Sequence, residues 1–175
     1  MPSNFDSLEK CELASYLNEV IIEAKAFKKR DKLNAYLAAP WFDESALMLH
    51  NSVKAILRNV GEFSKYNIYF PFDHTTKNPE ETFNENVRAI GDSEVIIALV
   101  SRKDVGTAWE IGYASALGKK VYLVGLDDTC FTSKTNLMLA FSGRCFTIDK
   151  LAKFLTGELD SVDYVQIGRT WEGIE

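Results

Sequence analysis

The chain has 175 residues, which is enough for one domain with a sizeable hydrophobic core. Its formal net charge of -5 argues against a general binder of nucleic-acid backbones, which would present a basic face. The three cysteines, Cys11, Cys130 and Cys145, lie far apart and form no CxxC pair or Cys/His metal spacing, so we expect a reduced, cytoplasmic setting and no metal site.

The N-terminal segment carries no targeting or membrane signal. Residues 1–10 contain no apolar core of a signal peptide, and no run in the chain is apolar over the length that spans a membrane. Residues 7–30 are predicted to form an amphipathic helix that ends in a charged cluster, Lys28 to Lys32. We expect residues 1–32 to be a helical extension that packs on the domain or on another subunit. A binding patch at the basic cluster is the alternative, although a short charge run is usually a solvated helix end.

Residues 33–175 are predicted to form one α/β domain. Five segments have the apolar character of strands: Leu33–Ala38, Tyr66–Phe70, Glu94–Val100, Lys120–Val124 and Arg144–Ile148. Helices are predicted between and after them, at about 44–60, 79–92, 105–117, 136–139 and 149–156, and the tail from residue 157 is expected to be irregular. Asp43 and Pro79 are start signals for two of these helices, and Gly61 and Gly118 are stop signals for two.

Strands that alternate with helices predict a parallel sheet with helices on both faces. The most economical topology is a doubly wound, flavodoxin-like sheet with the strand order 2-1-3-4-5, plus the extra N-terminal helix. Its switch point lies between the first and third strands, where the carboxyl ends bring Tyr36 and residues 38–42 beside Asp104 and Glu110. Ligands bind at this rim in open α/β sheets, so the sequence predicts a pocket there.

Glu110 is the candidate nucleophile of this pocket. It lies in the first turns of a helix, just past the carboxyl end of a buried strand. The positive end of the helix dipole favours an ionised carboxylate, and a partly desolvated carboxylate can act as a nucleophile. Asp104 lies six residues earlier and can point into the same pocket. Two carboxylates near one sugar can serve as nucleophile and acid/base, or one can anchor a sugar hydroxyl.

Aromatic side chains are the remaining candidates, because Trp41 and Phe42 can cover a flat heterocyclic base by stacking. Each candidate also has a purely structural explanation. Glu110 can be a solvated helix residue and Asp104 a helix-entry residue, while the aromatic residues, Tyr36 included, can belong to the core. Two further polar residues are expected at a loop surface and at a helix cap: His74 and Asn136. Spacing alone therefore supports a pocket and no named reaction.

Several catalytic motifs are absent from the sequence. It contains no GxGxxG, GxxxxGK[ST], HExxH or GxSxG pattern, so a Rossmann oxidoreductase, a P-loop enzyme, a zinc protease and a serine hydrolase of the usual type are disfavoured. A phosphoacceptor receiver domain shares the predicted topology but needs an acidic cluster near the end of the first strand. Residues 38–41, Ala-Ala-Pro-Trp, do not supply one.

The segment Asp104-Val-Gly-Thr-Ala-Trp-Glu110-Ile-Gly-Tyr-Ala strongly resembles the core motif of the nucleoside 2-deoxyribosyltransferase family, D-x-G-x-x-x-E-x-G-x-A. Residues 35–42 are similar to the family's first strand and loop, which carry a tyrosine near the nucleophile. The segment Asn136-Leu-Met138 is similar to the family's NLM element, and residues 171–173, Trp-Glu-Gly, resemble its aromatic ending. The match covers residues 33–148, with a weaker one at the tail, and leaves out the N-terminal helix.

The resemblance implies a deoxyribosyltransferase-like α/β domain over residues 33–175 and a covalent mechanism. Glu110 would attack C1′ of a 2′-deoxynucleoside as the base departs, and an acceptor base would then take the sugar with net retention. Tyr36 would orient Glu110, and Asp104 would hold sugar hydroxyls beside Gly106. Trp41, Phe42 and Asp73 would contact substrate. No metal or organic cofactor is implied.

The resemblance also implies an oligomer. In the family, the asparagine of the NLM element reaches into the active site of a neighbouring subunit. Asn136 would therefore contact the 5′-hydroxyl from an adjacent subunit, with Met138 in the same element. We expect a homo-oligomer built from dimers, up to a hexamer, that acts on deoxynucleosides and free nucleobases, and no nucleic-acid or membrane partner.

Two positions depart from the family pattern. Many members place an aspartate on the helix before the central strand, where this chain has Asn86. A neutral amide can hydrogen-bond a base but cannot be a general acid, so either Asn86 only orients the base, or Glu85 or a water molecule supplies the proton. The loop Asp73-His74-Thr75 replaces polar residues that select the base, which leaves purine or pyrimidine preference open.

Two competing functions remain. A 2′-deoxynucleoside 5′-monophosphate N-glycosidase, a hydrolase of the same superfamily, needs a phosphate site after the first strand. Residues 38–44 are apolar and acidic and should repel a phosphate, so the transferase is favoured. A non-catalytic nucleotide-sensing module would keep the pocket without the chemistry. The joint presence of Tyr36, Asp104 and Glu110 disfavours it.

Overall fold

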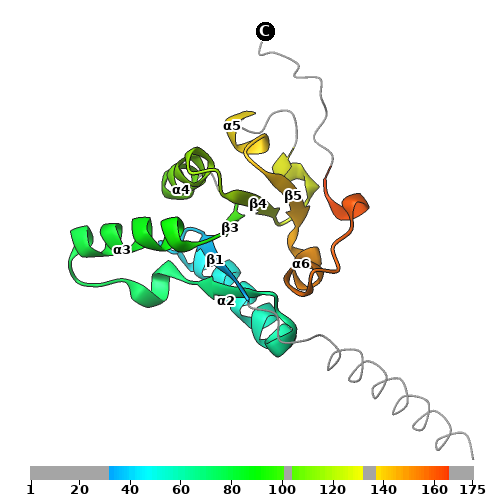
Figure 1. Cartoon of the computed structure of the whole chain (residues 1–175), viewed down its shortest axis with the longest axis horizontal. Helices are drawn as coiled ribbons and strands as arrows, with labels where there is room; N and C mark the ends of the chain where they lie inside the picture. The colour runs from blue at the N-terminus through cyan, green and yellow to red at the C-terminus, as the bar shows by residue number, and fades with distance from the viewer. Residues whose placement is uncertain (1–31, 101–103, 132–136, 166–175) are drawn as a thin grey trace, which may run out of the picture. The chain divides into compact units, whose positions relative to one another are not determined.

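The computed structural model describes residues 32–100, 104–131 and 137–165 (Figure 1). Its strands are β1 (Leu33–Ala38), β2 (Tyr66–Tyr69), β3 (Val95–Leu99), β4 (Lys120–Gly125) and β5 (Arg144–Thr147). All neighbouring strands are parallel, in the order β2-β1-β3-β4-β5. The predicted doubly wound topology is thus confirmed. The predicted N-terminal helix lies outside the described residues, and the division into 1–32 and 33–175 stays a prediction.

Helices and short 3-10 turns connect the strands. The helices are α2 (Glu44–Val60), α3 (Pro79–Asp92), α4 (Val105–Ala116), α5 (Leu137–Ala140) and α6 (Leu151–Thr156). The 3-10 turns are η1 (Gly61–Phe63), η2 (Pro71–His74), η3 (Asp128–Phe131), η4 (Ile148–Lys150) and η5 (Ser161–Asp163). The predicted last helix therefore begins as a 3-10 turn and becomes α-helical only at Leu151. No helix in the described ranges is long and apolar enough to cross a membrane.

The helix boundaries follow the start and stop signals of the sequence. The Asp43 carboxylate accepts a hydrogen bond from the backbone N–H of Ala46 at 2.8 Å and caps α2. Pro79 occupies the first turn of α3, where its missing N–H costs nothing. Gly61 follows α2 with a φ of +54°, a conformation that favours glycine because other side chains clash there.

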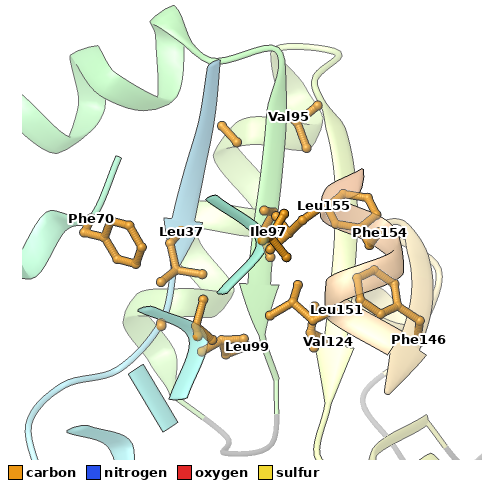
Figure 2. Close-up of a cluster of buried hydrophobic side chains, with 14 residues drawn as sticks. Leu37, Phe70, Val95, Ile97, Leu99, Val124, Phe146, Leu151, Phe154 and Leu155 are labelled. Carbon is orange, nitrogen blue, oxygen red and sulfur yellow. The ribbon is translucent and has the colours of Figure 1, made fainter. Parts of the chain in front are cut away.

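Each face of the sheet carries its own hydrophobic core. The α2/α6 face is filled by alternate strand residues, such as Leu37 and Ile97, and by α6, whose Leu151, Phe154 and Leu155 point at the sheet in Figure 2. The opposite face is covered by α3 and α4 (Figure 1). All five residues of β3 are buried, as expected for a central strand that is covered on both sides. The strand residues that alternate with Leu37 and Ile97 therefore face α3 and α4.

Candidate active site

Tyr36 and Glu110 meet at the predicted switch point. Tyr36 lies on β1 beside Ile96 of β3, on the α3/α4 face of the sheet, and its side chain is completely buried. Its hydroxyl donates a hydrogen bond of 2.5 Å to Oε1 of Glu110, a short distance typical of a bond to a carboxylate. Residues 74 positions apart in the sequence are thus joined by topology, as the sequence predicted. One oxygen of the Glu110 carboxylate is held by this bond.

The Glu110 carboxyl has a strongly altered affinity for protons. Its pKa is raised to about 7, chiefly by burial; the hydrogen bond from Tyr36 lowers the pKa, and the nearby charge of Asp104 adds to the increase. Glu110 is the sixth residue of α4, so it lies beyond the first turn, where the helix dipole acts most strongly. Desolvation therefore outweighs the dipole that we expected to keep this group ionised. Near neutral pH both protonation states are populated.

Tyr36 itself is a permanent hydrogen-bond donor. Burial raises the pKa of its phenol far above the usual value, and the adjacent Glu110 carboxylate raises it further. The proton therefore stays on Tyr36 throughout the physiological range. Tyr36 can orient Glu110 and donate to it, but it cannot act as a base there.

Asp104 has a structural role at the start of α4. Its Oδ2 accepts a hydrogen bond of 2.6 Å from the backbone N–H of Thr107, so it is the N-cap of the helix. The carboxylate lies over Gly106, where an added Cβ would come within 3.2 Å of Oδ2. Asp104 is also close enough to Glu110 for its charge to raise that pKa. The helix-entry role is confirmed, and contact with a sugar stays a prediction.

The aromatic residues that follow β1 form an open cluster. Trp41 contacts Phe42 and Phe72, with ring centroids 5.4 Å and 6.5 Å apart. Phe42 is 77% exposed, so the alternative of a core position does not hold for it. Trp41 is half-buried. The cluster is available to cover a flat ligand, although its contact with a base stays a prediction.

The other predicted substrate residues are spread over several elements. The Asp73 carboxylate is bound by Nζ of Lys54 on α2, at 2.5 and 2.6 Å, which ties η2 to that helix. Asn86 is half-buried on α3. Met138 on α5 is 76% exposed. Asn136 lies outside the described residues.

Sequence reasoning missed a stack of rings behind Tyr36. Tyr69 lies on β2 directly beside Tyr36, and the two rings stack with centroids 5.7 Å apart. The ring of His74 stacks on Tyr69 at 4.3 Å. Tyr69 and His74 line an open groove of about 380 Å³, together with Glu85 and Arg88 of α3. The predicted pairing of the first two strands was the available signal, because it places Tyr69 beside Tyr36.

His50 was also missed. It is 1% exposed, lies between Phe70 and Phe72, and both ring nitrogens lack a hydrogen-bond partner among the described residues. Burial and the nearby Lys54 lower its pKa. His50 is therefore neutral near pH 7 and packs as an aromatic ring. Within the described ranges, no group of three or more His, Cys, Asp or Glu side chains is arranged to hold a metal ion.

A model of the nucleoside 2-deoxyribosyltransferase family matches residues 35–145. A 2-deoxyribosyltransferase from Bacillus psychrosaccharolyticus is similar in structure, with a TM-score of 0.56 and 22% identity over 74% of this chain and 93% of that one. A conserved protein from Enterococcus faecalis has a TM-score of 0.59 and 17% identity, over 73% of this chain and 99% of that one.

A CMP N-glycosidase from Clostridium botulinum has a TM-score of 0.46 and 20% identity, over 71% of this chain and 97% of that one. No curated protein matches the sequence. The first two structural similarities establish the fold at these identities, and the family model covers the segment that contains Tyr36, Asp104 and Glu110.

Proposed function

The chain belongs to the nucleoside 2-deoxyribosyltransferase family, and from this premise we propose that it transfers 2-deoxyribose between nucleobases through a covalent intermediate on Glu110. The observation that carries the proposal is the partly buried hydrogen bond from Tyr36 to Glu110 at the predicted switch point of the sheet. A carboxylate held by one oxygen, in a desolvated position at this rim, is oriented for attack with the other oxygen. Deoxynucleosides and free nucleobases are the proposed substrates.

Two displacements at the anomeric carbon give the proposed reaction. In the first, Oε2 of Glu110 forms a bond to C1′ while the C1′–N bond breaks. The electron pair of the broken bond leaves with the base, which takes up a proton. In the second, a nitrogen of the acceptor base forms a bond to C1′ and the base gives up a proton, while the bond to Oε2 breaks with its electron pair and frees the carboxylate. Each displacement inverts C1′, so the product retains its configuration. Water in place of the acceptor base would give hydrolysis.

The ionisation of Glu110 sets the pH range of this chemistry. Only the carboxylate form can attack, and burial raises its pKa to about 7. The positive charge that develops on the sugar in the transition state then stabilises the buried carboxylate. We therefore expect the rate to rise with pH through neutrality. The same desolvation that raises the pKa makes the ionised group more reactive.

The departing base needs a proton that Asn86 cannot supply. The amide of Asn86 is neutral, so in this proposal it hydrogen-bonds and orients the base. Glu85 is the adjacent residue of α3 and lines the groove beside Tyr69. Glu85 or a water molecule supplies the proton. The substitution Glu85→Gln distinguishes these two proton sources, because only direct transfer from Glu85 requires its carboxyl group.

The loop after β1 favours an unphosphorylated substrate over a nucleoside monophosphate. A phosphate usually binds at backbone N–H groups of a helix N-terminus. At the start of α2, the Asp43 carboxylate accepts from the N–H of Ala46, and Glu44 adds a second negative charge in the first turn. An incoming phosphate would meet two carboxylates there. This observation supports the transferase over the monophosphate N-glycosidase.

An oligomer built from dimers is part of the proposal. Apolar side chains are exposed on α3 and α4, where Phe83 is 53%, Trp109 47% and Val105 82% exposed, and the rings of Phe83 and Trp109 lie 5.6 Å apart. Apolar side chains gathered on one surface are typical of a contact with another subunit. Light scattering after size-exclusion chromatography measures the assembly. Trp109→Glu should shift it towards the monomer, and an unchanged mass would contradict this surface as the contact.

Chromatographic product analysis tests the function. The protein is incubated with thymidine or deoxyinosine, with and without free adenine, and in parallel with deoxynucleoside monophosphates. Deoxyadenosine formed only when adenine is present, and lost in Glu110→Ala, is the expected result. Free base released from monophosphates without exchange would instead establish the hydrolase. A protein that binds deoxynucleosides but turns over none of these substrates would be a sensing module.

A further inference from the structure

The ring of Tyr36, which carries the hydroxyl bound to Glu110, stacks on Tyr69, and Tyr69 in turn stacks on His74. Tyr36 and Tyr69 are nearly parallel, at 12°, and Tyr69 and His74 are nearly parallel, at 11°. The three residues come from β1, β2 and η2, so the stack crosses the edge of the sheet. Tyr36 is completely buried, whereas His74 is exposed on its outer side. The stack thus runs from the surface to the Glu110 carboxyl.

Tyr69 acts in this stack through its ring and not through its hydroxyl. The Tyr69 oxygen is buried and accepts or donates no hydrogen bond among the described residues. The charges that face it are Glu85, which raises its pKa, and Arg88, which lowers it, but burial is the largest cause of the raised value. A buried hydroxyl without a partner lowers stability, because its desolvation is not compensated, whereas parallel ring contacts fix the neighbouring ring plane.

We propose that Tyr69 and His74 are positioning residues, whose stacked rings hold Tyr36 so that its hydroxyl stays on Oε1 of Glu110. The proposal rests on the proposed function for its kinetic consequences, and on ring geometry alone for its structural ones. The hydroxyl oxygen of a tyrosine lies on the axis about which its ring turns, so only a change of the first side-chain torsion, which would carry the ring out of the stack, moves the hydroxyl away from Oε1. The ring contacts from β2 and η2 confine the Tyr36 ring to this position.

The pKa of Glu110 reports whether the Tyr36 hydroxyl is bound to Oε1. The bond from Tyr36 lowers the pKa of Glu110, while burial and Asp104 raise it. If the stack is removed and Tyr36 leaves Oε1, the lowering contribution disappears and the pKa of Glu110 rises above about 7. Its ionised fraction at neutral pH then falls. A loss of stability alone would not change this equilibrium in the folded protein.

Three substitutions on one strand separate positioning from packing. Tyr69→Ala removes the central ring, Tyr69→Phe keeps the ring without its hydroxyl, and Tyr66→Ala is the matched control. Tyr66 lies three residues earlier on β2 and stacks on Phe154 on the opposite face of the sheet, with centroids 5.0 Å apart. The two alanine variants therefore remove the same side chain and a comparable ring contact from opposite faces.

The readouts are the pH profile of kcat/KM and an NMR titration of the carboxyl carbons in protein labelled with carbon-13 at glutamate. We expect Tyr69→Ala to move the ascending limb and the Glu110 titration to higher pH by about one pH unit. Starting from a pKa of about 7, this displacement lowers the ionised fraction, and with it kcat/KM at pH 7, about fivefold. Tyr69→Phe should match the unchanged protein within about twofold. His74→Ala should give a smaller shift with the same sign.

The outcomes distinguish this inference from the proposed function. Tyr66→Ala should be less stable by circular dichroism but should leave the Glu110 titration in place. If Tyr69→Ala titrates like Tyr66→Ala, the stack only supports stability and the inference is wrong. A protein without transferase activity, in which Tyr69→Ala still moves the Glu110 titration, would contradict the proposed function and support the positioning role.

Discussion

The α2/α6 face of the sheet buries mainly apolar side chains, whereas the α3/α4 face buries an ionisable pair. The two faces share the same strands: Leu37 points to one, and Tyr36, the preceding residue, points to the other. On the first face, burial contributes mainly favourable transfer of apolar surface. On the second, burial of the Glu110 carboxyl is unfavourable and raises its pKa to about 7. The α2/α6 face therefore provides the stability that allows the α3/α4 face to hold a desolvated carboxylate.

Removing the carboxylate from the α3/α4 face should have the largest effect. Glu110→Gln keeps the size of the side chain and an oxygen that can accept from Tyr36, but it cannot form the glycosyl bond. We expect turnover to fall at least about a thousandfold, the scale at which a covalent nucleophile is lost. Product analysis measures this. Transfer within tenfold of the unchanged protein would exclude Glu110 as the nucleophile.

A cavity opened on the α2/α6 face should have the opposite effect: it should lower the stability of the protein and leave its turnover unchanged. Phe146 of β5 is fully buried there and stacks on Phe154, with centroids 5.0 Å apart. Phe146→Ala should lower the free energy of unfolding by about 3–5 kcal/mol. Because the ring lies on the face away from Glu110, kcat per folded molecule should be unchanged. Urea unfolding and kinetics at low temperature measure the two, and a fallen kcat in fully folded protein would contradict the separation of the faces.

The strands and helices were the part of the molecule that the sequence predicted best. The apolar run of β3, the stop at Gly61 and the start at Pro79 are local signals, and together they were enough for the strand order. The positions of Tyr36 and Glu110 at the switch point follow from that order. Local signals of this kind are reliable because each depends on only a few neighbouring residues.

The properties of the site depended on contacts that local patterns do not contain. The raised pKa of Glu110 comes from tertiary burial, and reasoning from the helix dipole alone gave the wrong direction. The Asp73 carboxylate is bound by Lys54, 19 residues away on another element. The stack of Tyr69 and His74 depends on side-chain torsions. Each of these requires the assembled fold, so sequence patterns could indicate the residues but not their state.

The unfavourable burial of Glu110 should appear as a dependence of stability on pH. The folded pKa of about 7 lies above the ordinary value of 4.5, so between these values the unfolded chain loses a proton that the folded chain keeps. Stability therefore falls as pH rises through this window, and both states are protonated below it. The full difference corresponds to about 3 kcal/mol.

The Glu110→Gln variant isolates this contribution from that of the other carboxyl groups. At pH 4 it should be about as stable as the unchanged protein, and at pH 8 it should be more stable by up to about 3 kcal/mol, because it has no charge to bury. Urea unfolding at both values measures the difference. Equal stabilities at pH 8 would mean that the Glu110 carboxylate is well solvated when ionised, and that the contrast between the two faces is smaller than burial indicates.

The two helix caps give the smallest and most selective test, because each lies on a different face. Asp43 caps α2 and Asp104 caps α4. Asp43→Asn and Asp104→Asn both keep a capping oxygen, so each should change stability by less than about 1 kcal/mol.

Only the loss of the Asp104 charge should lower the pKa of Glu110, since that charge raises it. The ascending limb of kcat/KM should move to lower pH in Asp104→Asn and stay in place in Asp43→Asn. In the same variant KM for the deoxynucleoside should rise if Asp104 also holds the sugar. A limb that moves equally in both would show that net charge, and not the local field of the α3/α4 face, sets the state of Glu110.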